Sequence, residues 1–138
     1  LGESFFEGFA VTALPNGKVL VTGHGGTSSA RLYDPASGLS SATGPVSQTR
    51  SYHTATTLPN GRVLLAGGGP GFGSSPVPVA TADVYDPATN TFALLSGSMS
   101  YARSVHTAVV LPNGKVWMAG GRETSAMAVS TADRYRPR

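Results

Sequence analysis

Two histidines, each three residues after an arginine, have the clearest capacity for chemistry in this chain. His53 follows Arg50, and His106 follows Arg103 at the same spacing. Imidazole nitrogens are common metal ligands, so a histidine pair gathered near a symmetry axis is one way to hold a metal ion. The alternative is a hydrogen-bonding device repeated between strands, because the two pairs occupy matching places in duplicated segments. We favour this structural role and expect neither a metal nor a catalytic group at these histidines.

The segments that carry these pairs are repeats. Leu-Pro-Asn-Gly occurs in three copies, and each copy is followed by Lys or Arg, an apolar run and glycine. The copies start at Leu14, Leu58 and Leu111. A second marker, Tyr-Asp-Pro, begins at Tyr33 and Tyr85 and returns as Tyr-Arg-Pro at Tyr135. The interval of about 50 residues is typical of propeller blades.

Each repeat contains a predicted β-hairpin centred on Asn-Gly. The dipeptide separates an alternating segment, such as 53–58, from an apolar segment, such as 63–67. A tight primed turn needs positive φ at both central residues, and Asn and Gly tolerate this conformation best. We therefore expect primed turns at Asn16-Gly17, Asn60-Gly61 and Asn113-Gly114.

Further strands complete each predicted unit. The second strand of the hairpin has no polar alternation, which is typical of a strand covered on both faces. A third strand ends at the Tyr-Asp-Pro marker, where proline stops it, and a fourth is clearest at 91–95. Four strands per unit without helical periodicity predict an all-β propeller, with about three blades in a single segment, 1–138. The expected blades are about 6–49, 50–102 and 103–138, the last being incomplete.

The order of these motifs resembles the kelch repeat, in the form found in bacterial proteins and in the propeller of galactose-oxidase-like enzymes. The matching features are Arg-x-x-His-Thr, the Pro-Asn-Gly hairpin, a glycine doublet that ends the second strand, and Tyr-Asp-Pro. Blade one is an atypical copy, because Phe6 stands in the place of Arg50 and Phe9 in the place of His53. Gly23-His24 replaces its glycine doublet.

The resemblance implies a structural role for Arg50 and Arg103, which match the kelch arginines that brace neighbouring blades. A planar guanidinium with five donors suits several carbonyl groups at a blade junction. The functional alternative places both arginines at the central mouth, where they meet an acidic or carbohydrate ligand. Asp83 and Asp133 recur at matched third-strand positions and are also expected to be framework residues. The copper site of galactose oxidase does not carry over, because its cross-linked cysteine has no counterpart here, and we predict no cofactor.

Binding is expected in the loops between the second and third strands. Gly67–Gly73 superficially resembles a phosphate-binding loop, but no helix follows it and it lacks a Gly-Lys-Ser/Thr ending. Long loops on rigid scaffolds are common places for binding. The candidate loops are 68–80, which presents Phe72, and 122–129, which contains Arg122 and Glu123. His24 lies on the short loop of blade one as an isolated candidate.

Composition narrows the classes of partner. The 138 residues are 40% hydrophobic and 12% charged, which is compatible with a globular core. The net charge is +3, but the basic residues after the hairpin turns are a repeated feature, and no basic cluster with interleaved aromatics occurs. We therefore expect no nucleic-acid partner.

The sequence contains no transmembrane run, and no membrane partner is expected. Leu1–Glu7 is too short and acidic for a signal peptide. The absence of cysteine leaves the compartment open, and the family resemblance favours a secreted location.

We interpret the chain as a binding or scaffolding module for a protein or carbohydrate ligand, and not as an enzyme by itself. The rival hypothesis is a fragment of a larger secreted galactose-oxidase-like or carbohydrate-active enzyme whose catalytic residues lie outside this chain. Three blades are fewer than the roughly four to eight of a closed propeller. We therefore expect either a homo-oligomer, most simply a dimer of three-blade units, or a longer propeller. Leu1–Phe6 is the segment that could replace the missing strand at the open edge of blade three.

Overall fold

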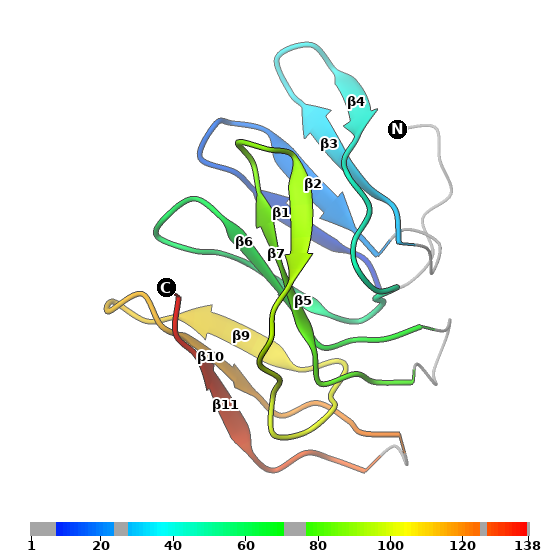
Figure 1. The fold of residues 1–138 in the computed structure, drawn as a ribbon, viewed down its shortest axis with the longest axis vertical. Coiled ribbons are helices and arrows are strands. Elements are labelled where there is room, and N and C mark those ends of the chain that lie inside the picture. The colour runs from blue at the N-terminus through cyan, green and yellow to red at the C-terminus, as the bar shows by residue number, and fades with distance from the viewer. Residues whose placement is uncertain (1–7, 24–27, 71–76, 125–126, 138) are drawn as a thin grey trace.

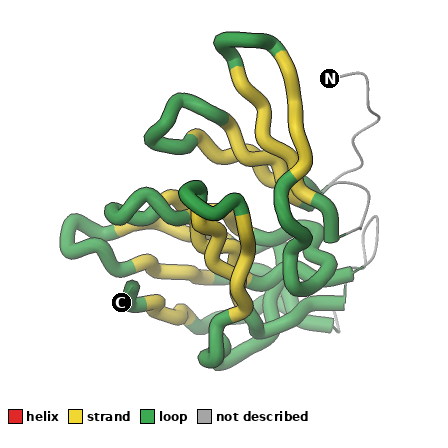
Figure 2. Tube along the Cα trace, turned by 45° about the horizontal axis from the view of Figure 1, so that its top comes forward, coloured by secondary structure: helices red, strands yellow, loops and turns green. Residues whose placement is uncertain are grey.

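The computed structural model describes residues 8–23, 28–70, 77–124 and 127–137. Within these ranges the regular structure is entirely β, in three antiparallel sheets that fan out from one side (Figures 1 and 2). The described residues include no helix that is long and apolar enough to cross a membrane. The predicted all-β class is confirmed.

Each sheet corresponds to one repeat, and we refer to the sheets as blades one, two and three. Blade one contains β1 (Ala10–Ala13), β2 (Val19–Thr22), β3 (Ala30–Asp34) and β4 (Leu39–Ala42), in that spatial order. Blade two contains β5 (Thr54–Thr57), β6 (Val63–Ala66), β7 (Ala82–Asp86) and β8 (Thr91–Leu94). Blade three contains β9 (Thr107–Val110), β10 (Val116–Ala119) and β11 (Ala132–Tyr135). Among the first strands, β1 contacts β5 and β5 contacts β9, whereas β4 and β8 lie at the outer rim.

The Pro-Asn-Gly hairpins differ from the prediction in their turn type. Gly61 has a φ of 82°, but Asn60 is not in the left-handed region, and the other two copies behave in the same way. The Gly61 amide donates to the Leu58 carbonyl at 2.9 Å, and the Leu58 amide donates to the Arg62 carbonyl at 2.7 Å. This is a three-residue loop, a type I turn followed by a left-handed glycine, and the primed turns predicted at Asn16-Gly17, Asn60-Gly61 and Asn113-Gly114 were wrong.

Proline explains the difference. Pro59 fixes φ near −65° at the first central position of the turn, which is the value that a type I turn requires and a primed turn forbids. The asparagine then acts through its side chain, because Asn60 Oδ1 accepts a hydrogen bond from the Arg62 amide at 3.1 Å. Asn16 and Asn113 make the equivalent bonds to the amides of Lys18 and Lys115.

The Asp-Pro turns after the third strands follow the expected chemistry. In blade two, Asp86 Oδ1 accepts from the Ala88 amide at 2.9 Å, and Asn90 takes the left-handed position with a φ of 57°. In blade one, Asp34 accepts from the Ala36 amide at 2.9 Å, and Gly38 has a φ of 72°. In blades one and two, a short aspartate side chain that caps its own turn thus leads the third strand into the fourth.

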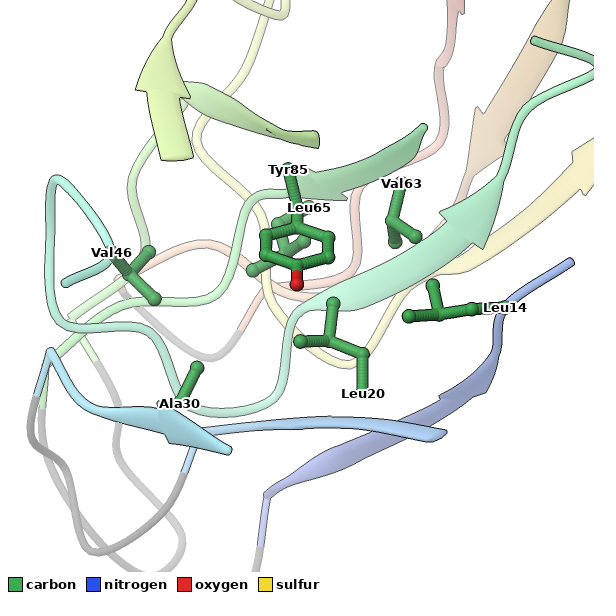
Figure 3. Close-up of a cluster of buried hydrophobic side chains, with 7 residues drawn as sticks. All are labelled: Leu14, Leu20, Ala30, Val46, Val63, Leu65 and Tyr85. Carbon is green, nitrogen blue, oxygen red and sulfur yellow. The ribbon is translucent and has the colours of Figure 1, made fainter. Parts of the chain in front are cut away.

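Two apolar clusters fill the spaces between blades. The first, between blades one and two, is shown in Figure 3 and comprises Leu14, Leu20, Ala30, Val46, Val63, Leu65 and Tyr85. The second, between blades two and three, comprises Leu58, Leu64, Ala66, Ala82, Met99, Val116 and Met118. Every residue of β6 is buried, because β6 contributes side chains to both clusters. The central strand of blade two is therefore covered on both faces, as its continuous apolar sequence predicted.

Candidate functional site

Arg50 lies in the interior at the end of blade two, where its guanidinium closes the gap between β6 and β7. Its Nε donates to Asp83 Oδ2 at 2.9 Å, and the exposed fractions of the two side chains are 1% and 0%. Nη1 donates to the carbonyls of Gly67 at 2.8 Å and Thr81 at 2.9 Å, and Nη2 donates to the Thr81 hydroxyl at 3.0 Å. Burial lowers the pKa of Arg50, and the hydrogen bond and charge of Asp83 oppose that shift. The pair is a buried, fully hydrogen-bonded ion pair.

Arg103 repeats this arrangement in blade three. Its Nη1 donates to the carbonyls of Gly120 at 3.1 Å and Thr131 at 2.9 Å, and Nη2 bonds Asp133 at 2.5 Å. The Asp133 side chain is 15% exposed, and Arg103 Nε is buried without a hydrogen-bond partner among the described residues. The resemblance implied that these arginine side chains brace neighbouring blades, but in these hydrogen bonds each guanidinium binds only its own blade. The contact between blades is made by the backbone. The Arg103 carbonyl accepts from the Gly68 amide of blade two at 2.8 Å.

A serine three residues before each arginine belongs to the same network, and the sequence analysis missed it. The Ser47 hydroxyl donates to Asp83 Oδ1, and the Ser100 hydroxyl and amide both donate to Asp133 Oδ1 at 2.8 Å. Ser-x-x-Arg in both copies was the available signal. These bonds satisfy the carboxylate oxygen that faces away from the arginine.

The two histidines bridge consecutive blades. His53 Nε2 lies 2.7 Å from the hydroxyl of Thr22 in blade one, and His106 Nε2 lies 3.0 Å from the hydroxyl of Thr54 in blade two. Both rings are buried, and Nδ1 of each has no hydrogen-bond partner in the described ranges. The histidines therefore sit in two separate junctions, one per pair of blades.

Burial keeps both imidazoles neutral. It lowers the pKa of His53 to about 3, and the positive charge of Arg50 acts in the same direction. It also lowers the pKa of His106 to about 4, with the charge of Arg103 adding to the effect. Protonation of either ring would bury a charge next to a guanidinium.

Glycines at the ends of the second strands leave room for these residues. A Cβ on Gly68 would collide with the Ser51 carbonyl and His53, and a Cβ on Gly121 would collide with the Ser104 carbonyl and His106. Both glycines have positive φ, 64° and 90°. The second glycine of each doublet is thus required by the close approach of the Arg-x-x-His segment itself.

A line of left-handed residues also links the blades and was not found from the sequence. Gly8, Tyr52 and Val105 occupy matching places and have φ of 91°, 57° and 54°. The Tyr52 amide donates to the Gly8 carbonyl at 2.7 Å, and the Val105 amide donates to the Tyr52 carbonyl at 3.0 Å. A tyrosine and a valine give no sequence signal for positive φ, so only the glycine of blade one hinted at this conformation.

The predicted binding residues are divided between described and undescribed parts of the chain. Phe72 and His24 lie outside the described residues. Arg122 is exposed, and its backbone bridges to both Ser104 and Ala128. Glu123 is half-buried, and its amide donates to the Met127 carbonyl at 3.1 Å. The described ends of the loop of blade three therefore pair with each other beside the glycine doublet.

Comparison with known proteins identifies the type of fold. No family model matches the chain, and no curated protein matches its sequence. Among solved structures it is similar to a fungal alcohol oxidase of the AA5 family, determined in complex with copper, with a TM-score of 0.77 over 89% of this chain. The chain folds as a kelch-type propeller segment. The sequence identity is 19%, so the likeness concerns the fold, and the match covers 28% of the oxidase chain.

The described residues of this kelch-type segment do not offer the donors that a copper centre needs. No group of three His, Cys, Asp or Glu side chains gathers within the described ranges, and the sequence contains no cysteine. The two buried histidines direct Nε2 to threonines in different junctions. These donors do not fit a copper ion, and their arrangement is that of junctions between blades.

Proposed function

We propose that this chain is a scaffolding and binding segment of a kelch-type ring, whose blades hold loops in place for a protein or carbohydrate partner. The observation that carries this proposal is that the side chains most capable of chemistry are buried and hydrogen-bonded within the blades. Arg50, Arg103, His53 and His106 are all buried and bonded to their own or the preceding blade. Residues that are buried and bonded in this way stabilise the blades, and recognition of a partner is left to the loops.

The outer face of blade three supports a further docking function within that ring. Trp117 occupies the place of Leu20 and Leu64, which are 0% and 1% exposed because the next blade covers each of them. Trp117 itself is 42% exposed, and its cross-strand neighbour Val109 is 56% exposed. An apolar position that is buried at two junctions and open at the third marks a surface for another blade.

Two polar positions on blade three support the same conclusion. In blade two, Thr54 meets His106 of the next blade, and a Cβ on Gly67 would collide with that ring. The matching residues of blade three are Thr107, which is exposed, and Gly120, beside which a Cβ would find open space. These are the places where the histidine of another blade would fit.

For the isolated chain, the proposed occupant is blade one of a second copy, placed head to tail. The opposite end of the molecule presents Phe9 and Val11, which are 44% and 59% exposed. Two sets of three blades make a ring within the roughly four to eight blades of known propellers, and closed symmetry satisfies both copies equally. Phe9 stands where His53 and His106 stand in the other blades, so this junction would lack the bond to Thr107 and be weaker than the internal ones.

Variants on the two faces test the docking. Trp117→Lys should dissociate the assembly, as measured by light scattering after size exclusion, while Leu39→Lys on the outer strand β4 should leave its mass unchanged. Phe9→His should tighten association, because it supplies the histidine that Thr107 lacks. Equal masses for the parent and the Trp117→Lys variant would overturn the proposed face, whereas a weaker assembly in Phe9→His would reject blade one as the occupant.

The loop end is the proposed place for a ligand. Arg122 and Glu123 lie at the described start of the loop of blade three, and together they offer a charged, hydrogen-bonding surface suited to peptide or sugar. A panel of immobilised glycans and peptides should give signals that fall at least about tenfold in an Arg122→Ala, Glu123→Ala double variant. Signals that survive in the double variant would exclude this turn as the contact.

A second candidate function follows from the structural comparison. The chain matches 28% of an alcohol oxidase chain, so it is also compatible with a non-catalytic part of the propeller of a larger oxidase or carbohydrate-active enzyme. In that case, copper-dependent oxidation of an alcohol or sugar should be found in a longer protein that includes these blades. The isolated chain should show none, and oxidation by the isolated chain would contradict both candidate functions as stated.

A further inference from the structure

Three of the four asparagines in the sequence are followed by glycine: Asn16, Asn60 and Asn113. Each is exposed in one of the Pro-Asn-Gly turns, which point to the same side of the fan (Figure 1). Asparagine before glycine is prone to spontaneous deamidation, because glycine has no side chain to hinder ring closure through its amide nitrogen. The turns are therefore candidate sites of chemical modification, and their geometry decides whether the reaction proceeds.

The reaction joins two neighbouring groups of the chain. The glycine amide nitrogen attacks Cγ of the asparagine side chain and forms a cyclic imide. The side-chain nitrogen leaves as ammonia, which carries away the proton of the glycine amide. Water then opens the imide at one of its carbonyl groups and gives either aspartate or an isoaspartyl residue, in which the main chain runs through the side chain. Water is the only reactant that the chain does not supply.

In the closed turn, the attacking amide is held by another acceptor. The Gly61 amide donates to the Leu58 carbonyl at 2.9 Å, and the other two turns contain the equivalent bond at 3.0 and 2.8 Å. The amide must give up this bond before it can lose its proton and turn towards Cγ of Asn60. The hydrogen bond therefore opposes ring closure for as long as the turn stays closed.

The asparagine side chain is held as well. Asn60 Oδ1 accepts from the Arg62 amide at 3.1 Å, and matching bonds at 3.0 and 3.1 Å hold Asn16 and Asn113. These bonds restrict the rotation that would bring Cγ to the glycine nitrogen. Ring closure needs the two reacting atoms close and aligned, and the turn holds each of them through a different bond.

Successive turns also restrain one another. A Cβ on Gly61 would lie 3.5 Å from Pro15 of the preceding turn, and a Cβ on Gly114 would lie 3.3 Å from Pro59. The proline of one turn thus packs beside the glycine of the next. Proline also fixes φ within its own turn, which favours the closed type I form.

Two other turns of the molecule show which product a Pro-Asn-Gly turn would tolerate. Asp34 and Asp86 each accept a hydrogen bond from the amide two residues further on, as the turn asparagines do. An aspartate in place of Asn60 would therefore keep this bond. An isoaspartyl residue lengthens the main chain by one methylene, so the bond between the Leu58 amide and the Arg62 carbonyl that closes the loop would lose its register.

We propose that Asn16, Asn60 and Asn113 are sites of spontaneous deamidation, which the closed turn protects and local opening exposes. Each conversion replaces a neutral amide with a carboxylate, so conversion of all three would cancel the net charge of +3. Loss of net charge lowers solubility and favours association. The extent of conversion at each asparagine therefore reports how often its turn opens.

Incubation of the full chain at mildly alkaline pH, followed by mass spectrometry of its peptides, tests the protection. Asn60 and Asn113 should convert at least about tenfold more slowly in the folded chain than in the same chain unfolded in guanidinium chloride, because only open turns react. Asn90 precedes threonine, whose side chain hinders ring closure, and should convert slowly in both states. Equal rates for Asn60 in the folded and unfolded chains would overturn the proposal.

A Pro112→Ala variant tests the protection at a single turn. Without proline the open form of this turn is favoured, and Asn113 should convert about two- to fivefold faster. Asn16 and Asn60 are matched controls in the same chain and should keep their rates. The variant unfolded in guanidinium chloride corrects for any change in intrinsic reactivity. An unchanged rate at Asn113, or an equal rise at all three asparagines, would overturn protection by the individual turn.

The two products are distinguished by their stability. Asn60→Asp should unfold at nearly the denaturant midpoint of the parent, whereas the purified isoaspartyl form should unfold at a lower one. Equal losses in the two forms would contradict the assignment of aspartate as the tolerated product. These measurements need no binding partner and do not depend on the mass of the assembly, so this inference and the proposed function can fail separately.

Discussion

Blade two and blade three have nearly the same sequence pattern but different surroundings. Comparing them separates the features that each repeat forms by itself from those that depend on a neighbouring blade. In blade two the central strand β6 is wholly buried, and the Arg50–Asp83 pair is sealed from solvent. In blade three the central strand β10 alternates between buried and exposed residues, and Asp133 is 15% exposed. The turns and networks form in both blades, so they depend on each repeat itself. Full burial depends on the neighbour.

The largest expected effect concerns the buried ion pairs. Arg50→Ala leaves Asp83 charged and buried, and should lower the free energy of unfolding by about 3–5 kcal/mol. Arg103→Ala should cost about 1–3 kcal/mol, because it leaves buried acceptors unpaired but Asp133 keeps some contact with water. Denaturant titration of both variants measures the difference.

The control for this pair of variants is Arg62→Ala. Arg62 and Asp86 form an ion pair 3.0 Å apart at the surface, so removing it should cost less than about 1 kcal/mol. Equal costs for Arg50→Ala and Arg103→Ala would show that the neighbouring blade adds nothing to the buried pair. An Arg103→Ala chain that melts like the parent but loses ligand binding would instead give that arginine a direct role in binding.

The second effect concerns matched apolar positions on β6 and β10. Leu64→Ala should cost roughly 2–5 kcal/mol, because it opens a cavity between blades two and three. Trp117→Ala, measured on dilute and dissociated chain, should cost less than about 1 kcal/mol despite the larger side chain, since its position lies on an open face. A larger loss for Trp117→Ala than for Leu64→Ala would mean that the blade-three face is covered from within the same chain.

Acid should weaken both internal junctions. The pKa values of His53 and His106 are about 3 and about 4 in the folded chain, below the ordinary value near 6.5. The unfolded chain therefore takes up protons first, and stability falls as the pH drops below about 6.5 towards the folded pKa values. At pH 5 the loss relative to neutral pH should be about 2 kcal/mol per histidine.

A His53→Gln, His106→Gln double variant isolates the contribution of the histidines. It should be less stable than the parent at pH 7.5 but should change little between pH 7.5 and 5, because its junctions carry no group that titrates there. Unfolding free energies from urea titrations at a series of pH values provide the comparison. An equally steep loss of stability in the double variant would place the acid sensitivity elsewhere.

The smallest effect should be the same in both blades. Gly61 and Gly114 have φ of 82° and 78° in equivalent hairpin turns, and valine strongly disfavours that region. Gly61→Val and Gly114→Val should each cost on the order of 1 kcal/mol or more, since the turn is local and does not depend on a neighbouring blade. An unchanged denaturant midpoint for Gly61→Val would count against the turn assignment, and clearly different costs would show that the turns are not equivalent.

The repeat made most of the fold predictable from sequence. Apolar runs ended by glycine and Tyr-Asp-Pro turns located the strands, because alternation, proline and glycine act through local sterics. The turn type was mispredicted, because Pro59 outweighs the Asn-Gly signal. The left-handed Tyr52 and Val105 could not have been predicted, since backbone bonds to the preceding blade hold them in that conformation.

The candidate site was predictable only as a set of residues. The spacing of Arg50 and His53 indicated one repeated device, but it did not show that the arginine side chain clamps its own blade while the histidine reaches the preceding one. That distinction depends on where neighbouring strands end. The threonine that meets the histidine illustrates the problem, because it comes from β2 at one junction and from β5 at the other.

The molar mass of the intact chain in solution tests the central claim most directly. The claim is that the face around Trp117 is an unfilled junction, equivalent to those that bury Leu20 and Leu64. Light scattering coupled to size exclusion should give a mass above that of one 14.0 kDa chain, twice that value for a closed pair, with Trp117 shielded from a fluorescence quencher. A well-folded, monodisperse species of one 14.0 kDa chain with an accessible Trp117 would contradict the account.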